Sequence, residues 1–557
     1  MEASPERKLA AMQTHNADLV IIGAGPVGMS CAMAAALRGL SVVVVERRKA
    51  GEAPSAKCNT VAARTMELFR TFGIADAVRA AGLPDAYPTD SIYCTSITGY
   101  ELARLRMPSR AERGGTGFLD DGWPTPEPMV RVSQIYLEPI MFERMRTLPG
   151  VTVLNETEFA SFEQNDTGVV VHAHAPSVGD IRIEAHYMIG CDGGRSAIRK
   201  AIGAELVGDA EIGRTRTTLV RAPKLLSLFG ERRPAWMSWV ASHKVRGTVI
   251  AIDGRETWLL HRSMPNREMP YEALDFDRSI RDLLGVDDSF TYEVLHHEDW
   301  TGRRLVADRF RDRRVFIAGD AAHIWVPFAG YGMNAGIADG ANLVWHLSAV
   351  IKQSAPPSRL DAYEAERHPI TEQVSRLAMD SVMQNMQAMG GVLPPPVLTE
   401  ATPEGEGLRK LIGERLYAMN VAQMSPAGLN FGYYYDRSPL IAYDGEAPPA
   451  YSMGDFTSST APGCRLPHVY VAGTSIYDRL GPDYTLLRFN RDAKADALLA
   501  AAKRAGVPLK LIDAPKPPEP VFRHDLLMVR TDQHIAWRGN SAPADADALM
   551  SRLSGRA

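Results

Sequence analysis

The sequence predicts a mixed α/β fold with three parts: a domain built on a parallel sheet, a domain built on an antiparallel sheet, and a small α/β unit at the C-terminus. Three observations predict this fold. Apolar strands that end in a glycine-rich or acidic turn and lead into a helix occur three times. Alternating apolar runs such as GTVIAI and TWLLHRSM, between residues 203 and 300, indicate strands of a second sheet. Strand and helix patterns return after about Pro462.

The composition is that of an ordinary water-soluble protein with more than one folding unit. The chain has 557 residues, of which 45% are hydrophobic and 23% charged, and its formal net charge is −4. This balance gives no electrostatic case for binding nucleic acid. No apolar run approaches the roughly 20 residues that cross a bilayer, so we expect a cytoplasmic protein without a membrane partner.

The N-terminus and the cysteines carry no site. Residues 1–16 are polar and lack the apolar core of a secretory signal, so we expect a flexible leader there. The five cysteines are scattered, with no CxxC pair and no nearby histidine at metal-ligand spacing. The sequence therefore predicts neither a disulfide framework nor a metal site.

The segment DLVIIGAGPVGMSCAMAAALRGLSVVVVERR, residues 18–48, has the pattern of a dinucleotide-binding strand–helix–strand unit. Gly23 permits a tight turn, Gly25 lets the backbone approach a pyrophosphate, and Gly28 lets the helix pack on the strand. The helix N-terminus offers free amides to the phosphates, and Glu46 ends the second strand where a carboxylate would bind a ribose. This segment predicts a Rossmann-like domain that binds either FAD or NAD.

Two later segments repeat the strand–turn–helix pattern. In HYMIGCDGGRSAIRKAIG, residues 186–203, a strand ends before Asp192, which either caps the next helix or belongs to a binding site. In GDAAHIWVPFAGYGMNAGIADG, residues 319–340, Asp320 follows an apolar strand, and a loop of small residues precedes a helix. Three such elements in one chain favour one shared site over three unrelated turns.

The ordered set GxGxxG, CDGGRS and GDAAH…P…GYGMN resembles the single-chain FAD-dependent aromatic hydroxylases, over roughly residues 18–369. In that family the first motif holds the ADP half of FAD, the second supports both FAD and NAD(P)H binding, and the third holds the ribityl-phosphate half. The resemblance therefore implies FAD as the cofactor. The cofactor-binding residues that we predict on this basis are Gly23, Gly25, Gly28, Glu46, Arg47, Gln134, Asp192, Asp320, Pro327, Gly332, Met333 and Asn334.

The loop after Asp320 also has suitable chemistry for a flavin. A ribitol chain needs a hydrogen-bond acceptor at a fixed strand end, as Asp320 would be. Small residues around Pro327 would let the backbone lie flat against the isoalloxazine ring. A helix that begins near Met333 and Asn334 would point its amides at the N1/O2 edge, where reduced flavin is negatively charged.

We predict Pro327 and Asn59 as catalytic residues. Asn59 lies in CNTVAARTMELFRTFGI, residues 58–74, which resembles a segment near the substrate in some phenol hydroxylases. Some relatives have an aspartate there, so Asn59 is assigned to the substrate side without a role as a base. Core packing and pocket lining both remain open for five residues of the second sheet: Trp236, Trp239, Trp258, His261 and Arg262.

The resemblance implies an order of domains. Residues 17–90, 131–203 and 301–389 would form the FAD-binding domain, 91–130 and 204–300 the substrate domain, 390–460 a linker and helical segment, and 461–557 a thioredoxin-like C-terminal domain. Only Cys464 lies in that last domain, which we therefore expect to be structural or to form a homodimer, without redox activity. Arg367 and Pro369 match a family pattern without a catalytic role.

The reaction that the resemblance implies is hydroxylation of a phenolic small molecule by O₂, with FAD as cofactor and NADPH or NADH as co-substrate. It proceeds through a flavin C4a-hydroperoxide, and the group that deprotonates the phenol is not identified by the sequence. A halogenase or oxidase of the same fold is an alternative, although WMSW at 236–239 lacks the Ile-Pro of the halogenase pattern. The alternative from another class is a non-catalytic flavin-binding partner protein.

Overall fold

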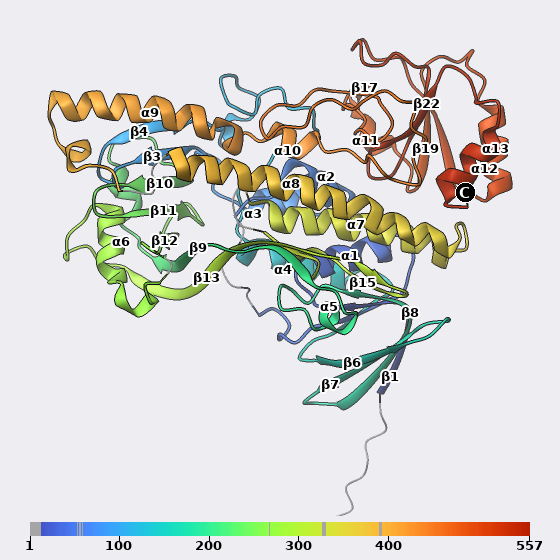
Figure 1. Ribbon diagram of the computed structural model, residues 1–557, viewed down its shortest axis with the longest axis horizontal. Coiled ribbons are helices and arrows are strands. Elements are labelled where there is room, and N and C mark those ends of the chain that lie inside the picture. The colour runs from blue at the N-terminus through green and yellow to red at the C-terminus, as the bar shows by residue number, and fades with distance from the viewer. Residues whose placement is uncertain are drawn as a thin grey trace, which may run out of the picture.

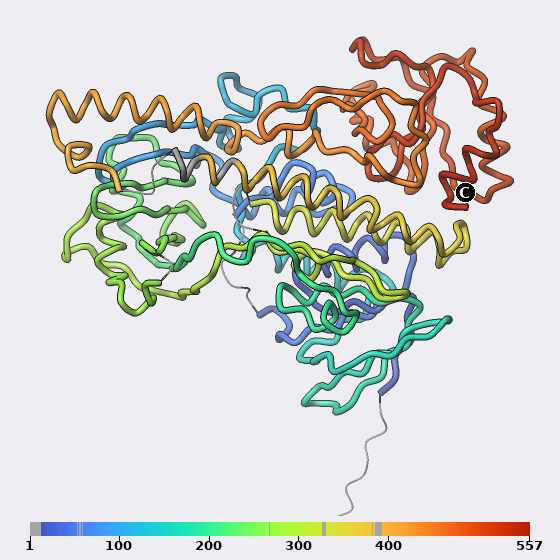
Figure 2. Tube along the Cα trace, in the orientation of Figure 1, coloured from blue at the N-terminus to red at the C-terminus, as the bar shows by residue number. Residues whose placement is uncertain are grey.

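The computed structural model describes residues 13–52, 54, 57, 59–266, 268–325, 330–388 and 393–556. Its mixed α/β fold confirms the predicted fold class. Figures 1 and 2 show the two large sheets joined by long strands, with helices α7, α8 and α9 lying across them and the C-terminal unit at one end. Within the described residues, every helix is too short or too polar to serve as a membrane span.

The first sheet is the predicted parallel one. Its strands follow the order β14-β15-β8-β1-β2-β5, and β15, β8, β1, β2 and β5 are parallel neighbours. The antiparallel β6–β7 hairpin extends it through β7, which pairs with β8. The strands are β1 (Gln13–Ile22), β2 (Val42–Val45), β5 (Val151–Leu154), β6 (Glu158–Gln164), β7 (Val169–Ala175), β8 (Gly179–Gly190), β14 (Arg311–Asp312) and β15 (Val315–Ile317).

Residues 13–16, which the sequence analysis placed in a leader, form the start of β1, and residues 1–12 lie outside the described residues. Residues 13–16 pair with Ile181–Glu184 of the long strand β8. Their polar, mostly exposed side chains are typical of a loop, but their backbone groups gain ladder hydrogen bonds at the end of the sheet. Backbone pairing therefore outweighs side-chain polarity at this strand end.

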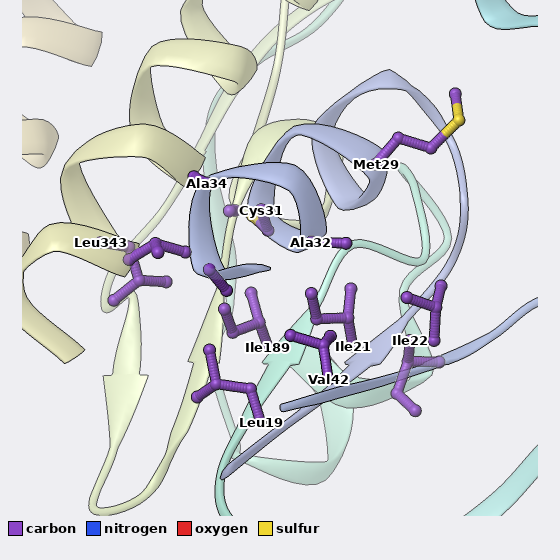
Figure 3. Close-up of a cluster of buried hydrophobic side chains, with 14 of the residues drawn as sticks. Leu19, Ile21, Ile22, Met29, Cys31, Ala32, Ala34, Val42, Ile189 and Leu343 are labelled. Atoms are coloured by element: carbon purple, nitrogen blue, oxygen red, sulfur yellow. The ribbon is translucent and has the colours of Figure 1, made fainter. Parts of the chain in front are cut away.

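The core of the first sheet explains why apolar runs surround the glycine turn. Figure 3 shows Ile21 of β1, Val42 of β2 and Ile189 of β8 facing α1 (Pro26–Leu37), with Leu343 of α7 (Tyr331–Ile351) close by. All of these side chains are almost fully buried. The helices nearest this core are α2 (Ala63–Phe72), α3 (Ala75–Ala81), α4 (Gln134–Arg146) and α5 (Ala197–Ala201).

The second sheet is mostly antiparallel, as predicted, with one parallel pair, β3–β10. Its order is β16-β13-β9-β12-β11-β10-β3-β4, and α6 (Phe276–Leu284) packs on it. Strand β13 continues to Ala307, so the sheet extends past residue 300, where the sequence analysis ended the substrate domain. The strands are β3 (Ser91–Cys94), β4 (Glu101–Leu105), β9 (Leu206–Arg221), β10 (Met237–Ala241), β11 (Arg246–Ala251), β12 (Thr257–Ser263), β13 (Glu293–Ala307) and β16 (His323–Ile324).

The C-terminal unit has the strand order of a thioredoxin-like fold. Its sheet runs β20-β19-β21-β22, with β19 and β20 parallel and the other pairs antiparallel. Cys464 is a buried free thiol, and residues 461–556 contain no second cysteine. The elements are β17 (Tyr470–Val471), β18 (Thr474–Ser475), α11 (Ile476–Arg479), β19 (Tyr484–Arg488), α12 (Asp496–Ala505), β20 (Leu509–Asp513), β21 (Leu526–Val529), β22 (Ile535–Gly539) and α13 (Ala546–Ser554).

This unit docks on the rest of the chain through a shared core. Trp345 of α7 packs among its residues, and its indole N–H donates to Asp483 (3.1 Å). Helix α8 (Asp361–Ala388) runs beside α7 with Pro369 inside it, and α9 (Pro403–Met424) and α10 (Ala427–Phe431) follow. The C-terminal unit is therefore packed against the first domain over a buried surface.

His346 of α7 lies fully buried in this region, and burial lowers its pKa to about 4. In the unfolded chain this histidine takes up a proton near pH 6.5, whereas in the folded protein it stays neutral until about pH 4. The stability contributed by the neutral ring is therefore complete above pH 6.5 and is lost as the pH falls towards 4. The wild-type free energy of unfolding should fall between pH 7.5 and pH 5, and we expect this fall to be about 2 kcal/mol smaller in His346→Gln. Urea unfolding at the two pH values measures it; an unchanged difference would contradict the assignment.

Candidate functional site

The three sequence motifs meet at one edge of the parallel sheet. In register, Ile22 of β1 lies beside Val45 of β2 and Gly190 of β8, and Gly190 lies beside Ile317 of β15. These are the last residues of their strands, and the predicted site residues follow each of them. They are Gly23, Glu46, Asp192 and Asp320. The carboxyl edge of a parallel sheet is where such folds bind ligands.

The three glycines of the first turn differ in what requires them. Gly23 has φ +103°, and a Cβ there would lie 2.4 Å from the Cys191 carbonyl oxygen. A Cβ on Gly28 would lie 1.9 Å from the Gly23 carbonyl oxygen, so both glycines are required by the protein itself. Gly25 has φ −72° and ψ 178°, and a Cβ there would meet no atom of the described residues within 4 Å.

Neither backbone conformation nor packing explains glycine at position 25. The residue precedes α1, whose N-terminus has no side-chain cap and carries Pro26 in its first turn. Free amides and open space at a helix N-terminus suit a pyrophosphate, which needs close backbone approach. The glycine turn therefore fits the ADP half of FAD.

Glu46 is buried beside this turn, and its neighbour in the site is Arg48 rather than Arg47. Glu46 Oε2 accepts a hydrogen bond from the Ala24 amide (2.6 Å), and Oε1 accepts one from the Arg48 amide (2.9 Å). The Arg48 side chain donates to the Ala24 carbonyl (3.1 Å) and to Glu138. Arg47 is exposed. Residues 47 and 48 form a bend after β2, which brings the Arg48 side chain back to Glu46, a contact that the sequence analysis did not predict.

Gln134 begins α4 and is almost completely buried. Its Nε2 donates to Glu138 Oε1 (3.0 Å), and Glu138 Oε2 accepts from Arg48 Nη1 (3.1 Å). Burial raises the pKa of Glu138, while Arg48 opposes that rise. Gln134 thus belongs to a chain of side chains that ends at Glu46, at the edge of the predicted ribose site.

One carboxylate oxygen of Asp192 accepts amides at the start of α5, and the other has no partner in the described part of the chain. Its Oδ2 accepts the amides of Ala197 (2.7 Å) and Ile198 (3.2 Å) at the start of α5. Its Oδ1 is buried and has no hydrogen-bond partner among the described residues. A buried acceptor without a partner is costly, so the free oxygen fits a polar ligand at this edge.

Asp320 lies in the short turn Gly319–Ala321, between β15 and β16. Its side chain is exposed, yet burial raises its pKa while His323 and Lys57 lower it. Water therefore reaches the Asp320 carboxylate on one side while protein surrounds it on the other. A carboxylate in this position fits the polyol chain of FAD.

Helix α7 starts without a side-chain cap, after Gly330 at φ +68°. A Cβ on Gly332 would meet no atom of the described residues within 4 Å, so none of them fills the space beside the first turn. Met333, in this first turn, is partly buried. The free amides and partial positive charge of the α7 N-terminus suit the electron-rich edge of a flavin. Pro327 lies outside the described residues.

Asn334 holds the chain around the start of α7. Its Oδ1 accepts from the Ala62 amide (2.9 Å), and its Nδ2 donates to the carbonyls of Thr60 (3.1 Å) and Gly330 (2.6 Å). The side chain is therefore fully engaged with protein, and its contribution to a flavin site is positional. It fixes the segment that carries Asn59 against the helix start.

A cluster of aromatic side chains lies next to this point. Trp325, Tyr331 and Tyr451 pack with Ala62 in one apolar cluster. The Trp325 indole nitrogen, the two tyrosine hydroxyls and the Asn59 amide oxygen are buried without a hydrogen-bond partner among the described residues. Unpaired polar atoms in an apolar wall fit a ligand that is mostly apolar and carries a few polar groups.

Two of the five residues left open in the region of the second sheet belong to its core. Trp236 and Trp258 are core residues, 4% and 1% exposed. Trp239 stacks on Tyr93 (6.1 Å between ring centres), and its indole nitrogen has no partner among the described residues. His261 Nδ1 lies 2.6 Å from Thr217 Oγ1, and burial lowers its pKa to about 4, so the ring is neutral. Arg262 donates to the Arg246 carbonyl (3.2 Å).

A buried triad behind the Asp320 turn was missed in the sequence. His323 Nε2 lies 2.6 Å from Asp339 Oδ2, and Arg367 Nε donates to Asp339 Oδ1 (2.7 Å). All three are at most 2% exposed. Arg367, for which no catalytic role was expected, neutralises the buried Asp339 carboxylate, which in turn binds His323 next to the Asp320 turn.

Comparisons with known proteins identify the family of the chain. Residues 16–378 match the family model described as an FAD binding domain, and residues 459–557 match the one described as the C-terminal part of an aromatic-ring hydroxylase. The chain is 30% identical to the FAD-dependent monooxygenase apdD of Emericella nidulans, over 99% of this chain and 92% of that protein. It is 29% identical to phenol 2-monooxygenase of a Pseudomonas species, over 97% and 92%.

A solved structure extends the likeness to the whole fold. The rebeccamycin biosynthetic enzyme RebC with reduced flavin has a TM-score of 0.87 and 30% identity, covering 98% of this chain and 100% of that one. The family model covers more than half of the chain, and the glycine turn, the Asp192 oxygen and the open helix start all suit FAD. The chain therefore belongs to the FAD-dependent aromatic-ring hydroxylases, and it is a flavoprotein monooxygenase.

Proposed function

We propose that the chain uses NAD(P)H, FAD and O₂ to hydroxylate a phenolic aromatic small molecule. The observation that carries this proposal is the aromatic cluster at the start of α7, whose buried hydroxyl and amide atoms lack protein partners. A phenol supplies what such a wall lacks, because it has an apolar ring and one oxygen that both donates and accepts.

Bound FAD would supply the redox chemistry, accepting hydride from NAD(P)H and activating O₂ for oxygen transfer from the C4a side. The chain's own residues would hold the phenol in place. Burial raises the pKa of Tyr331, so its hydroxyl stays protonated and acts as a donor. Asn59 would accept the substrate hydroxyl proton in a hydrogen bond while the phenol is neutral.

Burial dominates the electrostatics at Tyr331 and raises the pKa of its hydroxyl, while Arg131 and Arg64 oppose that rise as positive charges. A bound phenol would meet the same burial. Hydrogen-bond donation by Tyr331 and the two positive charges would offset part of the cost of forming the electron-rich phenolate. The phenolate is the form that an electrophilic oxygen attacks at the ortho or para carbon.

A relative supports the substrate class, since one is named phenol 2-monooxygenase. NADH and NADPH are both compatible with the proposal. NAD(P)H is a cytoplasmic co-substrate, and we expect the reaction there.

The proposal is tested by purifying the protein with FAD and following NADH and NADPH oxidation against simple phenols, phenolic acids and polycyclic phenols. We expect oxidation to accelerate with a substrate and the product to gain one oxygen atom by mass. A halogenated product, or flavin turnover without oxygen insertion into any phenol, would contradict hydroxylation.

We expect Tyr331→Phe to lower kcat/KM for the substrate about 10- to 100-fold, because one hydrogen bond to a charged oxygen contributes about 1.5–3 kcal/mol. FAD affinity should stay unchanged, since the ring is retained. Tyr417→Phe, on the exposed side of α9, is the matched control. Equal kinetics of wild type and Tyr331→Phe would remove Tyr331 from the substrate site.

A further inference from the structure

The turn between β21 and β22 lies in the buried contact between the C-terminal unit and the first domain. Arg530 follows β21 and is completely buried. Its guanidinium donates to both oxygens of Glu366 on α8 (2.6 and 2.7 Å) and to Asp532 (2.9 Å). Asp532 also accepts from the Tyr435 hydroxyl (3.0 Å). The tip of this hairpin is thus bound to α8 by a bidentate ion pair.

Glu366 is shared between several elements. Its Oε2 accepts from Asn342 Nδ2 on α7 (2.8 Å), and its Oε1 accepts from the Ser438 hydroxyl (2.5 Å). The carboxylate is completely enclosed in the side-chain contacts of α7, α8 and the hairpin. A buried carboxylate of this kind depends on its cation, because removal of one partner leaves an uncompensated charge.

The next residue of α8 reaches the flavin loop. Arg367 binds Asp339 of α7, and Asp339 binds His323, three residues after Asp320. The His323 ring lies 4.9 Å from that of Trp325. Adjacent residues of α8 therefore bind the C-terminal hairpin on one side and the loop that carries Asp320 on the other.

A second set of contacts leads from the same hairpin to the opposite wall. Arg64 of α2 donates to Gln533 Oε1 (2.7 Å) and to the Asp532 carbonyl (3.1 Å). Helix α2 begins at Ala63, directly after the Ala62 amide that Asn334 binds. The hairpin tip therefore contacts the helices behind both sides of the flavin site.

We propose that the β21–β22 hairpin of the C-terminal unit positions the flavin site, with Arg530 as the positioning residue. Arg530 fixes α8 and α7 through Glu366, and these helices fix the Asp320 turn and the uncapped start of α7. This gives the thioredoxin-like unit a role that needs no thiol. The inference concerns FAD affinity and the rigidity of the Asp320 loop. It rests on the proposed hydroxylation only for the expected fall in product yield.

The main test compares Arg530→Lys with wild type in the full-length protein. Lysine keeps the positive charge but loses the planar fork that binds both carboxylate oxygens. We expect FAD to bind about 3- to 30-fold more weakly, as for substitutions along coupled networks. Titration of apoprotein with FAD, followed by flavin fluorescence, measures this. In apoprotein, amides of residues 318–325 and 331–340 should exchange with deuterium faster.

A second variant covers the case in which Arg530→Lys alone is misfolded. Arg530→Met combined with Glu366→Gln removes the Arg530 charge together with that of Glu366, its fully buried partner, while Asp532, the other partner, is 17% exposed. The matched control is Arg538→Lys, because Arg538 is also a buried arginine of this hairpin but binds Asp444 and Glu446 (2.7 and 2.6 Å) within the C-terminal half. The control should change neither FAD affinity nor the exchange of those amides.

The bound-flavin absorbance spectrum and the yield of product per NAD(P)H complete the test. We expect a changed spectrum and a lower yield in both Arg530 variants. Wild-type FAD affinity, exchange and spectrum in both variants would overturn the positioning role. If wild-type protein oxidises no NAD(P)H with any phenol, the proposed function fails, while FAD affinity and amide exchange still decide this inference.

Discussion

Gly25→Val should weaken FAD binding by about 100-fold or more while leaving the apoprotein as stable as wild type. Two amide hydrogen bonds to a charged pyrophosphate contribute about 1.5–3 kcal/mol each, and the valine side chain would occupy their approach. Gly25 has an extended backbone and no protein atom within 4 Å of an added Cβ, so valine costs the empty fold little. Titration with FAD and urea unfolding of apoprotein separate the two effects.

Gly407→Val is the control for this substitution. Gly407 is exposed on α9, and a Cβ there would also meet no protein atom within 4 Å. FAD affinity should match wild type in this variant. If Gly25→Val bound FAD as tightly as wild type, the pyrophosphate would lie elsewhere. If it failed to fold, the argument that only the ligand requires this glycine would be wrong.

Arg367→Met should lower the free energy of unfolding by about 3–5 kcal/mol, because it leaves the buried Asp339 carboxylate without its cation. Asp339 and Arg367 are 0% and 2% exposed, and the Nε–Oδ1 distance is 2.7 Å. The same change should weaken FAD binding, since Asp339 holds His323 in the Asp320 turn. Urea unfolding of apoprotein measures the first effect and FAD titration the second.

The surface ion pair Arg376–Glu372, also on α8, is the control for Arg367→Met. Arg376 donates to Glu372 at 3.0 Å, but its side chain is 67% exposed, so Arg376→Met should change the free energy of unfolding by less than about 1 kcal/mol. Equal losses in the two variants would show that Arg367 acts as an ordinary surface arginine. A double substitution with Asp339→Asn should recover much of the loss caused by Arg367→Met.

The sequence predicted the parts of the site whose geometry is local. Gly23 and Gly28 are required by contacts within one turn and the neighbouring strand end, so a short pattern is enough to identify them. The parallel register then brings Glu46, Asp192 and Asp320 to one edge, because each follows the end of a neighbouring strand. Local strand–turn–helix patterns were therefore enough to predict the fold class.

Contacts between distant parts of the chain could not be predicted in this way. Arg530 and Glu366 are 164 residues apart, and no local pattern pairs them. The sequence could not predict the ion pair of Arg367, because Asp339 and His323 lie on other elements. Asn334 was expected beside the flavin, but only the folded chain shows that its amide is used by Ala62, Thr60 and Gly330.

The most direct measurement is a crystal structure of the protein with FAD bound. The account predicts the adenosine ribose beside Glu46, the pyrophosphate against Gly25, the ribityl chain beside Asp320 and the isoalloxazine ring at the start of α7, next to Gly332. Electron density for FAD away from this edge, or protein that binds no FAD at all, would contradict it.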